Sequence, residues 1–435
     1  MNRSSAVESI QEIIVQFLRS EAIGIESGEE AVRSLVRESG AQALGQRWTE
    51  QAREQEPKQL QCECGRRFRI RPKYQKKLTT LLGTTEVERN YYWCPKCRTS
   101  RLWLDERLGC RGRSHTGKVQ ECVAMAVASQ TYLESKRLLE TLAGLRLSHY
   151  VLEEIAEQLG SALGSERQAM IEQAEEDELS SAERPGTLVI ETDGVFVRTR
   201  EDGWKEAKSV VVFPYEVTAG GCEPEPGRVS YSAKVEDCEQ AGRRMYAEAC
   251  RRGLKTAQRV VVLADGAEWI WNQSRLHFPK AIEVIDWYHA VERLWNVANT
   301  VFGEQSPEAK QWEEQQEAFL WEGQVESVLQ AMRNELFSRK KTEKNFLGSD
   351  REAILQTNLA YFTRHMRRMD YARFRKEKLP IGSGVVESSC KHYVAQRCER
   401  SGMRWNYPGL HAILELRAAL LSDDWRRVQD LFKAA

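Results

Sequence analysis

Three aspartates stand at the ends of three apolar stretches: Asp193 closes VIETD, Asp265 closes VVVLAD and Asp286 closes EVID. Open α/β sheets bind ligands at the carboxyl ends of their strands, and carboxylates gathered there repel one another unless a cation compensates. Their hard oxygens suit Mg²⁺ or Mn²⁺, which bind through a few carboxylates together with substrate phosphates. The pattern predicts a divalent metal site, and the alternative is that each aspartate simply makes a turn.

Two further residues could complete such a site. Glu387, in LPIGSGVVESSCK, lies in the first turn of a predicted helix, where the helix dipole alone would favour it; its spacing does not make it a ligand. His289 follows Asp286 by three residues, so both can lie on one helix face. A histidine there could position a phosphate or assist a proton transfer, or it could simply be packed or hydrogen-bonded.

Four cysteines form a second candidate site. CEC at 62–64 and CPKC at 94–97 supply four thiolates, as a treble or ribbon-like structural zinc site needs. The first pair departs from the usual C-x-x-C spacing, and Cys110 or His115 could replace one ligand; four reduced thiols in a small β-rich module are the alternative. The predicted ligands are Cys62, Cys64, Cys94 and Cys97.

The charge of the 435-residue chain is zero overall but unevenly spread. The segment from Cys62 to Lys118 holds 15 Lys/Arg against 5 Asp/Glu, and that from Tyr361 to Lys378 holds 7 against 2. The segment from Ser165 to Arg184 is acidic, with 7 carboxylates against 2 basic residues. Two basic segments in a neutral chain suit a nucleic-acid binder with local contact surfaces, and solvated surface charge is the alternative.

The composition, 41% apolar and 29% charged, is typical of a soluble globular protein. No apolar run reaches the ~20 residues of a membrane-spanning helix, and the N-terminus has no signal-peptide pattern. We therefore expect a cytoplasmic protein, whose eleven cysteines are thiols or metal ligands rather than disulfides.

Periodicity places the aspartates on an α/β framework, with a hairpin turn at Glu201-Asp202-Gly203. Strands followed by alternating helix and strand indicate a sheet that is partly antiparallel and partly parallel. Residues from about 306 to 375 look wholly helical. The expected elements are strands over 187–200, 204–217 and 228–233, a helix over 237–252, a strand over 259–265, a helix over 266–278, a strand over 281–286 and a helix over 287–302.

Helical patterns precede this framework, over about 6–55 and 118–180. Residues 129–163 are typical of two helices joined by a short turn, with Ser148 as a helix cap and with Leu138, Leu139 and Leu142 facing a core. This is helix-turn-helix spacing. The acidic polar face of the second helix argues against tight phosphate contact, so a plain helical hairpin stays equally open.

Together these motifs resemble a known family. ETDG, LADGAEWIW, HFPKAIEVIDWYHAVERLW and LPIGSGVVESSCK, then GMRW at 402–405, are similar to the ISKra group of bacterial insertion-sequence transposases, distant relatives of the Mutator-like DDE transposases. The resemblance runs from Cys62 to about Leu421. It implies an α/β RNase H-like catalytic domain with a helical insertion, preceded by a small Cys-rich, zinc ribbon-like module and a helical, helix-turn-helix-like domain.

The resemblance also implies roles. Asp193, Asp265 and Glu387 would be the catalytic carboxylates and hold two Mg²⁺ (or Mn²⁺) ions, with Asp193 bridging both. Asp286 and His289 match an Asp-x-x-His element and would be auxiliary. Two ions about 3.5–4 Å apart can activate a water or a DNA 3′-hydroxyl and stabilise the leaving oxygen. The implied reaction is DNA cleavage and strand transfer at the ends of the element.

Basic residues near both sites are predicted to contact DNA phosphates. The stretch RRFRIRPKYQKK mixes cations with Phe68 and Tyr74, which could stack on bases or sugars. The stretch YFTRHMRRMDYARFRKEK precedes the glutamate helix. The alternative to DNA contact is that it forms a solvated helix face. The predicted DNA-binding residues are Arg66, Arg67, Arg69, Arg71, Lys73, Arg364, Arg367, Arg368, Arg373, Arg375 and Lys391.

These patterns predict six divisions of the chain, with Pro185-Gly186 at the main boundary. They are an N-terminal helical region (1–58), a Cys-rich basic zinc-binding-like module (59–117), a helix-turn-helix-like region with an acidic linker (118–184), the first part of an RNase H-like core (185–303), a helical insertion (304–378), and the glutamate helix with C-terminal helices (379–435).

The implied partner is double-stranded DNA, bound by a homodimer or larger assembly of a bacterial protein that is nucleoid-associated when on DNA. An RNase H-like nuclease that cuts without joining is one alternative, and strand-transfer products would separate the two. An inactive, transposase-derived DNA-binding regulator is another, although all three acidic positions are filled. A glycosidase, whose two carboxylates need no metal, would resist chelators.

Overall fold

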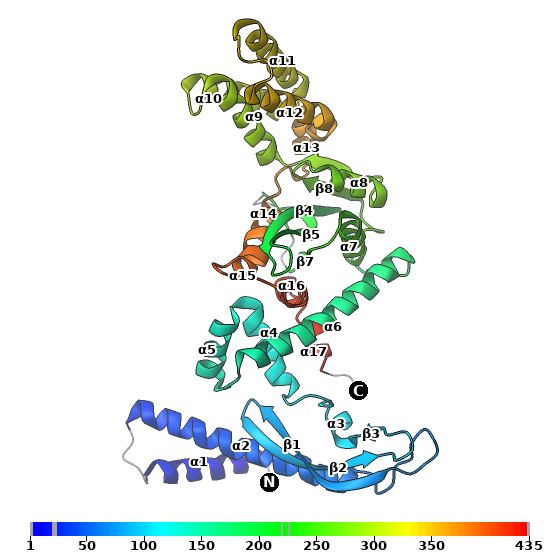
Figure 1. Ribbon diagram of the computed structural model, residues 1–435. Coiled ribbons are helices and arrows are strands. Elements are labelled where there is room, and N and C mark those ends of the chain that lie inside the picture. The colour runs from blue at the N-terminus through cyan, green and yellow to red at the C-terminus, as the bar shows by residue number, and fades with distance from the viewer. Residues whose placement is uncertain (1–2, 20–23, 219–220, 225–226, 433–435) are drawn as a thin grey trace. The chain divides into compact units, whose positions relative to one another are not determined.

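The computed structural model of the chain describes residues 3–19, 24–218, 221–224 and 227–432 (Figure 1). The chain forms two compact units, the first of Met1–Ile155 with Arg426–Ala435 and the second of Ala156–Trp425. The division falls within the long helix α6 (His149–Glu175). The six divisions expected from the sequence stay predictions.

The first unit is built on an antiparallel hairpin of β1 (Arg69–Thr80) and β2 (Gly83–Trp93), to which the short β3 (Ser100–Arg101) adds. Helix α2 packs on β2, where Gly45 allows a close approach because a β-carbon there would collide with Thr85. The helices of this unit are α1 (Arg3–Arg19), α2 (Ile25–Gln55), α3 (Trp103–Arg107), α4 (Gly117–Ser129), α5 (Tyr132–Ala143) and α17 (Arg426–Asp430).

Helix α5 and the start of α6 form the helical pair expected from the sequence. The hydroxyl of Ser148 accepts a hydrogen bond from the Val151 amide at 3.3 Å, as a helix cap does. Leu139 is buried, but Leu138 is 42% exposed and Leu142 is 70% exposed. The prediction that all three leucines face a core is wrong, because α5 packs through the face that carries Leu139.

The second unit contains a six-stranded sheet in the order β6-β5-β4-β8-β9, with β7 also paired to β5. Strand β5 pairs antiparallel with β4, β6 and β7, whereas β4, β8 and β9 run parallel to one another. The mixed α/β sheet expected from the sequence is confirmed. The strands are β4 (Thr187–Arg198), β5 (Trp204–Thr218), β6 (Gly221–Pro224), β7 (Ser230–Lys234), β8 (Arg259–Ala264) and β9 (Ile282–Ile285).

Helices join and cover these strands. Several begin at a side-chain cap: Asp237, Ser306 and Ser349 each accept a hydrogen bond from the amide three residues on. Figure 1 shows α10, α11 and α12 gathered beyond the β8 side of the sheet. The helices are α7 (Cys238–Arg251), α8 (Glu268–His277), α9 (Trp287–Phe302), α10 (Pro307–Trp321), α11 (Val325–Thr342), α12 (Asp350–His365), the 3₁₀ turn η1 (Met366–Arg368), α13 (Tyr371–Lys376), α14 (Gly384–Ser389), the π-helical η2 (Cys390–Ala395), α15 (Gln396–Cys398) and α16 (Tyr407–Leu421).

Candidate metal and nucleic-acid sites

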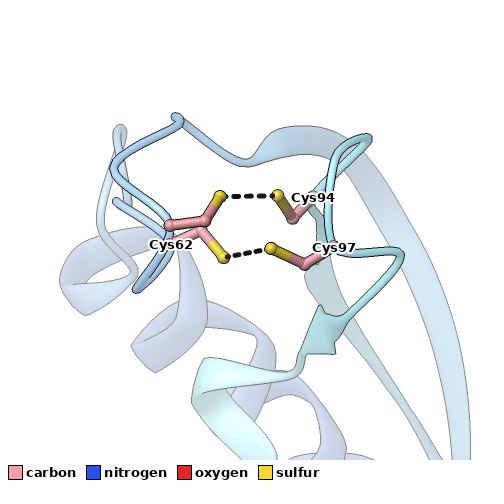
Figure 2. A group of neighbouring side chains, drawn as sticks. Cys62, Cys94 and Cys97 are labelled. Carbon is pink, nitrogen blue, oxygen red and sulfur yellow. Dashed lines mark hydrogen bonds between the residues drawn. The ribbon is translucent and has the colours of Figure 1, made fainter.

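The four predicted zinc ligands form one group, the thiol cluster (Cys62, Cys64, Cys94 and Cys97), in which all sulfur atoms lie within 4.8 Å of one another. The sulfur atoms of Cys62 and Cys97 lie 3.8 Å apart, and those of Cys64 and Cys94 lie 3.7 Å apart. Figure 2 shows Cys62 facing Cys97, with Cys94 beside them. A tetrahedral zinc ion with Zn–S distances of ~2.3 Å requires S–S edges of about 3.8 Å. The cluster could therefore bind zinc, and neither Cys110 nor His115 belongs to it.

Two tight turns aim these thiols at one another. The Cys62 carbonyl accepts a hydrogen bond from the amide of Gly65, whose φ of +81° is easily reached only by glycine. The Cys94 carbonyl accepts one from Arg98 at 2.9 Å. Backbone amides of Cys97 and Lys96 lower the pKa of Cys94 to about 6, whereas the hydrogen bond with Cys64 and burial raise the pKa of Cys97 to about 12. Cys94 is therefore the thiol that ionises most readily, as a metal ligand must. The short C-x-C spacing is accommodated by the glycine turn.

A basic surface adjoins the thiol cluster. All five cations predicted to contact DNA in this unit are exposed along the lead-in to β1 and its first residues. Arg89 is instead buried and Lys76 is partly buried, and both bind Asp105. The basic segment thus contains solvent-facing charges, which include all five predicted contacts, and two further charges that hold the module together. The exposed residues are Arg66, Arg67, Arg69, Arg71 and Lys73.

The second unit brings the three aspartates to one edge of its sheet, the carboxylate edge (Asp193, Asp265 and Asp286). Residue 191 pairs with 263 in the parallel strands β4 and β8, so Asp193 and Asp265 occupy equivalent positions two residues further on. Residue 264 pairs with 285 in β8 and β9, which puts Asp286 in register with Asp265. Neighbouring strands lie ~4.8 Å apart, so the register alone makes the three residues neighbours.

Asp265 meets the turn interpretation, whereas Asp193 lies inside β4 and does not. Asp193 accepts a hydrogen bond from Gly194 at 2.7 Å, and Asp265 accepts one from Ala267 at 2.9 Å. Each of these bonds uses Oδ1, which leaves Oδ2 facing other partners. Asp286 is different, because its Oδ1 accepts from His289 and its Oδ2 accepts from the Ser383 amide. Its oxygens are committed to protein groups, as suits an auxiliary residue.

The charges along this edge are coupled. Burial raises the pKa of Asp193, and the nearby charge of Asp265 raises it further. The hydrogen bond to Asp286 raises the pKa of His289, to which Asp265 and Asp193 also contribute. Burial acts to raise the pKa of Asp286, but hydrogen bonds from His289 and Ser383 leave it lower than usual. A cation at this edge would relieve the repulsion between the first two carboxylates.

Helix α14, which carries Glu387, lies against the same part of the sheet. The Cys390 thiol donates to Asp193 Oδ2 at 3.6 Å, and the Ser209 and Ser389 hydroxyls lie 3.3 Å apart. Glu387 itself is exposed and pairs with Lys391 at 2.7 Å. Among the described residues, Asp193, Asp265 and Glu387 do not form a group whose donor atoms all lie within 4.8 Å. They are on neighbouring elements, but the glutamate is turned toward a lysine.

Glu191, which the sequence reading missed, anchors the loop before α14. Its carboxyl is fully buried, accepts the Val386 amide at 2.7 Å, and has an Oε1 without a hydrogen-bond partner. Burial raises its pKa to about 8, against the hydrogen bond from Val386. Asp286 holds the Ser383 amide of the same loop. The sequence signal for Glu191 was a carboxylate inside an apolar run, two residues before Asp193.

The basic stretch of the second unit separates into two sets. Arg375 stacks on Trp321 at 3.8 Å and donates to its carbonyl at 2.9 Å, so it holds α13 to α10. Arg364, Arg367, Arg368 and Arg373 instead line a cavity of about 670 Å³. The other predicted DNA contact, Lys391, is the partner of Glu387.

No helix of the described residues is long and apolar enough to cross a membrane. In comparisons with known proteins, the model of an uncharacterised protein family, UPF0236, matches residues 21–432. No curated protein matches the chain.

Proposed function

This chain belongs to the uncharacterised family UPF0236, and we propose that it is a metal-dependent DNA transposase that cuts and joins strands at the ends of an insertion sequence. The observation that carries the proposal is the register of β4 and β8. It makes Asp193, which lies inside β4 just past its parallel pairing with β8, a neighbour of Asp265 at the carboxyl end of β8. Ligands of open α/β sheets bind at such ends.

The donor set fits divalent magnesium or manganese. Asp193 and Asp265 each keep one carboxylate oxygen free of local backbone bonds, and hard oxygen donors are those that Mg²⁺ prefers. Glu387 is one turn from Cys390, whose thiol touches Asp193. A rotation of the Glu387 side chain away from Lys391 would direct it toward the same space.

Each residue then has a distinct part in the reaction. Two bound ions would supply Lewis acidity to the attacking and leaving oxygens. Asp193, Asp265 and Glu387 hold those ions, while Asp286 orients His289 through the bond between Oδ1 and Nδ1 at 3.0 Å. His289, with its raised pKa, can donate a hydrogen bond or a proton to a phosphate oxygen.

The architecture supports an RNase H-like catalytic domain interrupted by a helical insertion. An antiparallel set of strands leads into the parallel pair that bears the aspartates. Helices α10 to α13 then separate β9 from the loop before α14. This is the order that the family resemblance implies.

The test uses the full-length protein and duplexes taken from the DNA on either side of its gene. We expect Mg²⁺- or Mn²⁺-dependent nicking and joining to a target plasmid, both lost in EDTA. Asp193→Asn and Asp265→Asn should reduce cleavage by more than about 100-fold. Asp237→Asn, which keeps an oxygen at the cap of α7, is the matched control.

The outcomes separate the alternatives. Cleavage without joined products would favour the nuclease. DNA binding without cleavage under any metal condition would favour the inactive regulator. Undiminished cleavage by Asp265→Asn would contradict the assignment of this carboxylate.

A further inference from the structure

A cavity of about 670 Å³ in the second unit is lined by five arginines and a single carboxylate. Its walls come from the end of α8, from the turn that enters β9, and from α12, η1 and α13. Residues of α8 and of α13 line it together, and β9 contacts η1. We call this the arginine cavity; its arginines are Arg275, Arg364, Arg367, Arg368 and Arg373.

One arginine is part of the wall. Arg368 binds Glu283, the carboxylate of the lining, at 2.6 Å, and its guanidinium lies over the Trp271 ring at 4.5 Å. Trp271 is buried, and the side chains of Arg368 and Glu283 are only 14% and 19% exposed. This pair neutralises the acidic group, so the remaining four arginines give the cavity a net positive charge.

The other four arginines present exposed side chains. Arg367 makes no ion pair or side-chain hydrogen bond with any residue that the structure describes. Arg364 lies 3.6 Å from Glu268, and Arg373 lies 3.6 Å from Asp370 and 3.8 Å from Glu377. Such exposed pairs contribute little and exchange readily for a better anion. Arg275 donates a hydrogen bond to the amide oxygen of Asn272 at 2.5 Å and forms no ion pair with a residue that the structure describes.

The positive field also reaches buried groups behind the wall. His365 is almost fully buried, and burial lowers its pKa to about 4, with the charges of Arg368, Arg364 and Arg293 adding to the effect. A histidine kept neutral in this way adds no charge to the wall of the cavity. Such a cavity is suited to an anion rather than to an apolar ligand.

Helix α12 connects the arginine cavity to the carboxylate edge. The Tyr361 hydroxyl donates to the Asp265 carbonyl at 2.7 Å. Arg364 follows Tyr361 by three residues, which is a rise of ~4.5 Å along a helix. A phosphate held by Arg364 would therefore lie about one helical turn along α12 from the point where Tyr361 contacts Asp265.

We propose that the arginine cavity binds the phosphodiester backbone of the DNA strand next to the bond that is cut, with Arg275 and Arg367 as its main contacts. The inference rests on the proposed function, which it deepens by assigning the place of the flanking DNA. Arginine forks match phosphate oxygens, and the cavity is larger than a single phosphate requires. Arg275 lies outside the basic stretch noted in the sequence and comes from another element.

The experiment measures DNA affinity by fluorescence anisotropy in EDTA, so that catalysis plays no part. Arg275→Ala/Arg367→Ala should weaken binding about 10- to 100-fold and reduce the slope of log affinity against log salt by about two. Arg275→Lys/Arg367→Lys should retain most of the slope. Arg333→Ala, an ion-paired arginine on α11 away from the cavity, is the control, and thermal melting verifies that each variant is folded.

The outcomes distinguish this proposal from the proposed function. If the wild type binds DNA and the double alanine variant binds it equally, the cavity is not the site, while the transposase proposal stands. If the wild type binds no DNA, both fail. If inorganic phosphate binds at submillimolar concentration in calorimetry but the variant keeps its DNA affinity, the cavity is a small-anion site and the DNA assignment is overturned.

Discussion

The thiol cluster and the carboxylate edge are both predicted metal sites, but the chain assembles them differently. The four thiols come from two turns at the ends of one hairpin, and their sulfur atoms lie within 4.8 Å of one another. The carboxylates come from separate parallel strands and from a helix that follows nearly two hundred residues later. In the described chain they are neighbours without forming so close a group.

The difference follows from charge. Thiols can be protonated and neutral, so four of them can approach without a cation, held by backbone turns alone. Ionised carboxylates repel at the same distance, and Glu387 is turned to the nearest cation, Lys391. A local thiolate site is therefore fixed by a few turn residues, whereas the carboxylate site depends on strand register and on the loop that delivers α14.

The largest expected effect is loss of the first unit's hairpin when the thiol cluster is broken. Cys94→Ser should abolish stoichiometric zinc binding, because structural zinc contributes ~10–16 kcal/mol of apparent binding free energy. Without the metal, the backbone amides of β1 and β2 should exchange their hydrogens faster. Elemental analysis of the purified protein should give one zinc per chain in the wild type.

Cys122→Ser is the matched control, since Cys122 lies outside the cluster on α4. A wild-type protein that contains no zinc, and whose hairpin is equally protected with a chelator, would show that the thiols are merely reduced cysteines packed together.

The next effect concerns the loop that delivers Glu387. Glu191→Ala leaves the buried Val386 amide without its acceptor, which should cost about 2–4 kcal/mol of unfolding free energy. Glu191→Gln keeps an acceptor oxygen and should cost much less. Denaturant unfolding measures both, and hydrogen exchange at Val386 should accelerate only in the alanine variant. Equal costs for the two variants would mean that the hydrogen bond is not what fixes the loop.

The two sites also differ in how far the sequence could predict them. The strand ends before Asp265 and Asp286 were predictable because apolar β-branched runs stop there, and the parallel order follows from alternating helices and strands. Asp193 also closes an apolar run in the sequence, but it lies inside β4, which continues to Arg198. The register that aligns them could not be read from the sequence, because it depends on pairing between segments about seventy residues apart. Glu191 was missed for a related reason: its partner, Val386, is brought to it only by the fold.

The basic stretches show the same limit on exposed surfaces. A count of arginines predicts a positive surface but cannot tell that Arg375 stacks on Trp321 while Arg367 faces the arginine cavity. The leucines of α5 show it for apolar residues, since helical spacing put Leu138 and Leu142 toward a core that does not cover them. Periodicity gives a helix its faces, but the neighbours decide which face is buried.

A buried carboxylate away from the candidate site provides a further comparison. Glu313 on α10 is 1% exposed, its Oε1 has no hydrogen-bond partner, and burial raises its pKa to about 7, with Glu317 and Glu314 adding to the rise. The folded state then holds a proton that the unfolded state releases above about pH 4.5. The contribution of Glu313 to stability is therefore fully present below about pH 4.5 and is lost as pH rises through about 7, by about 1–3 kcal/mol.

Glu313→Gln should remove this part of the pH dependence and stabilise the protein at pH 8, whereas the exposed neighbour substitution Glu314→Gln should not. Urea unfolding at pH 5 and pH 8 compares them. If Glu313→Gln instead loses stability at pH 8, the ionised Glu313 carboxylate is stabilised by a partner, and burial does not dominate its pKa.

The smallest expected effect tests whether Lys391 competes with a metal ion for Glu387. The two side chains are an exposed i,i+4 pair with 75% and 53% of their surfaces accessible, so the pair contributes only about 0.3–0.5 kcal/mol. Lys391→Ala should therefore lower the Mn²⁺ concentration for half-maximal cleavage about twofold and change stability by less than about 0.5 kcal/mol. Lys391→Arg keeps the charge and is the control.

If Lys391→Ala instead leaves the metal requirement unchanged and reduces the salt slope of DNA binding by about one, Lys391 is a phosphate contact as the sequence predicted. Glu387 would then have to meet the other carboxylates by a movement of α14 rather than by a change of partner.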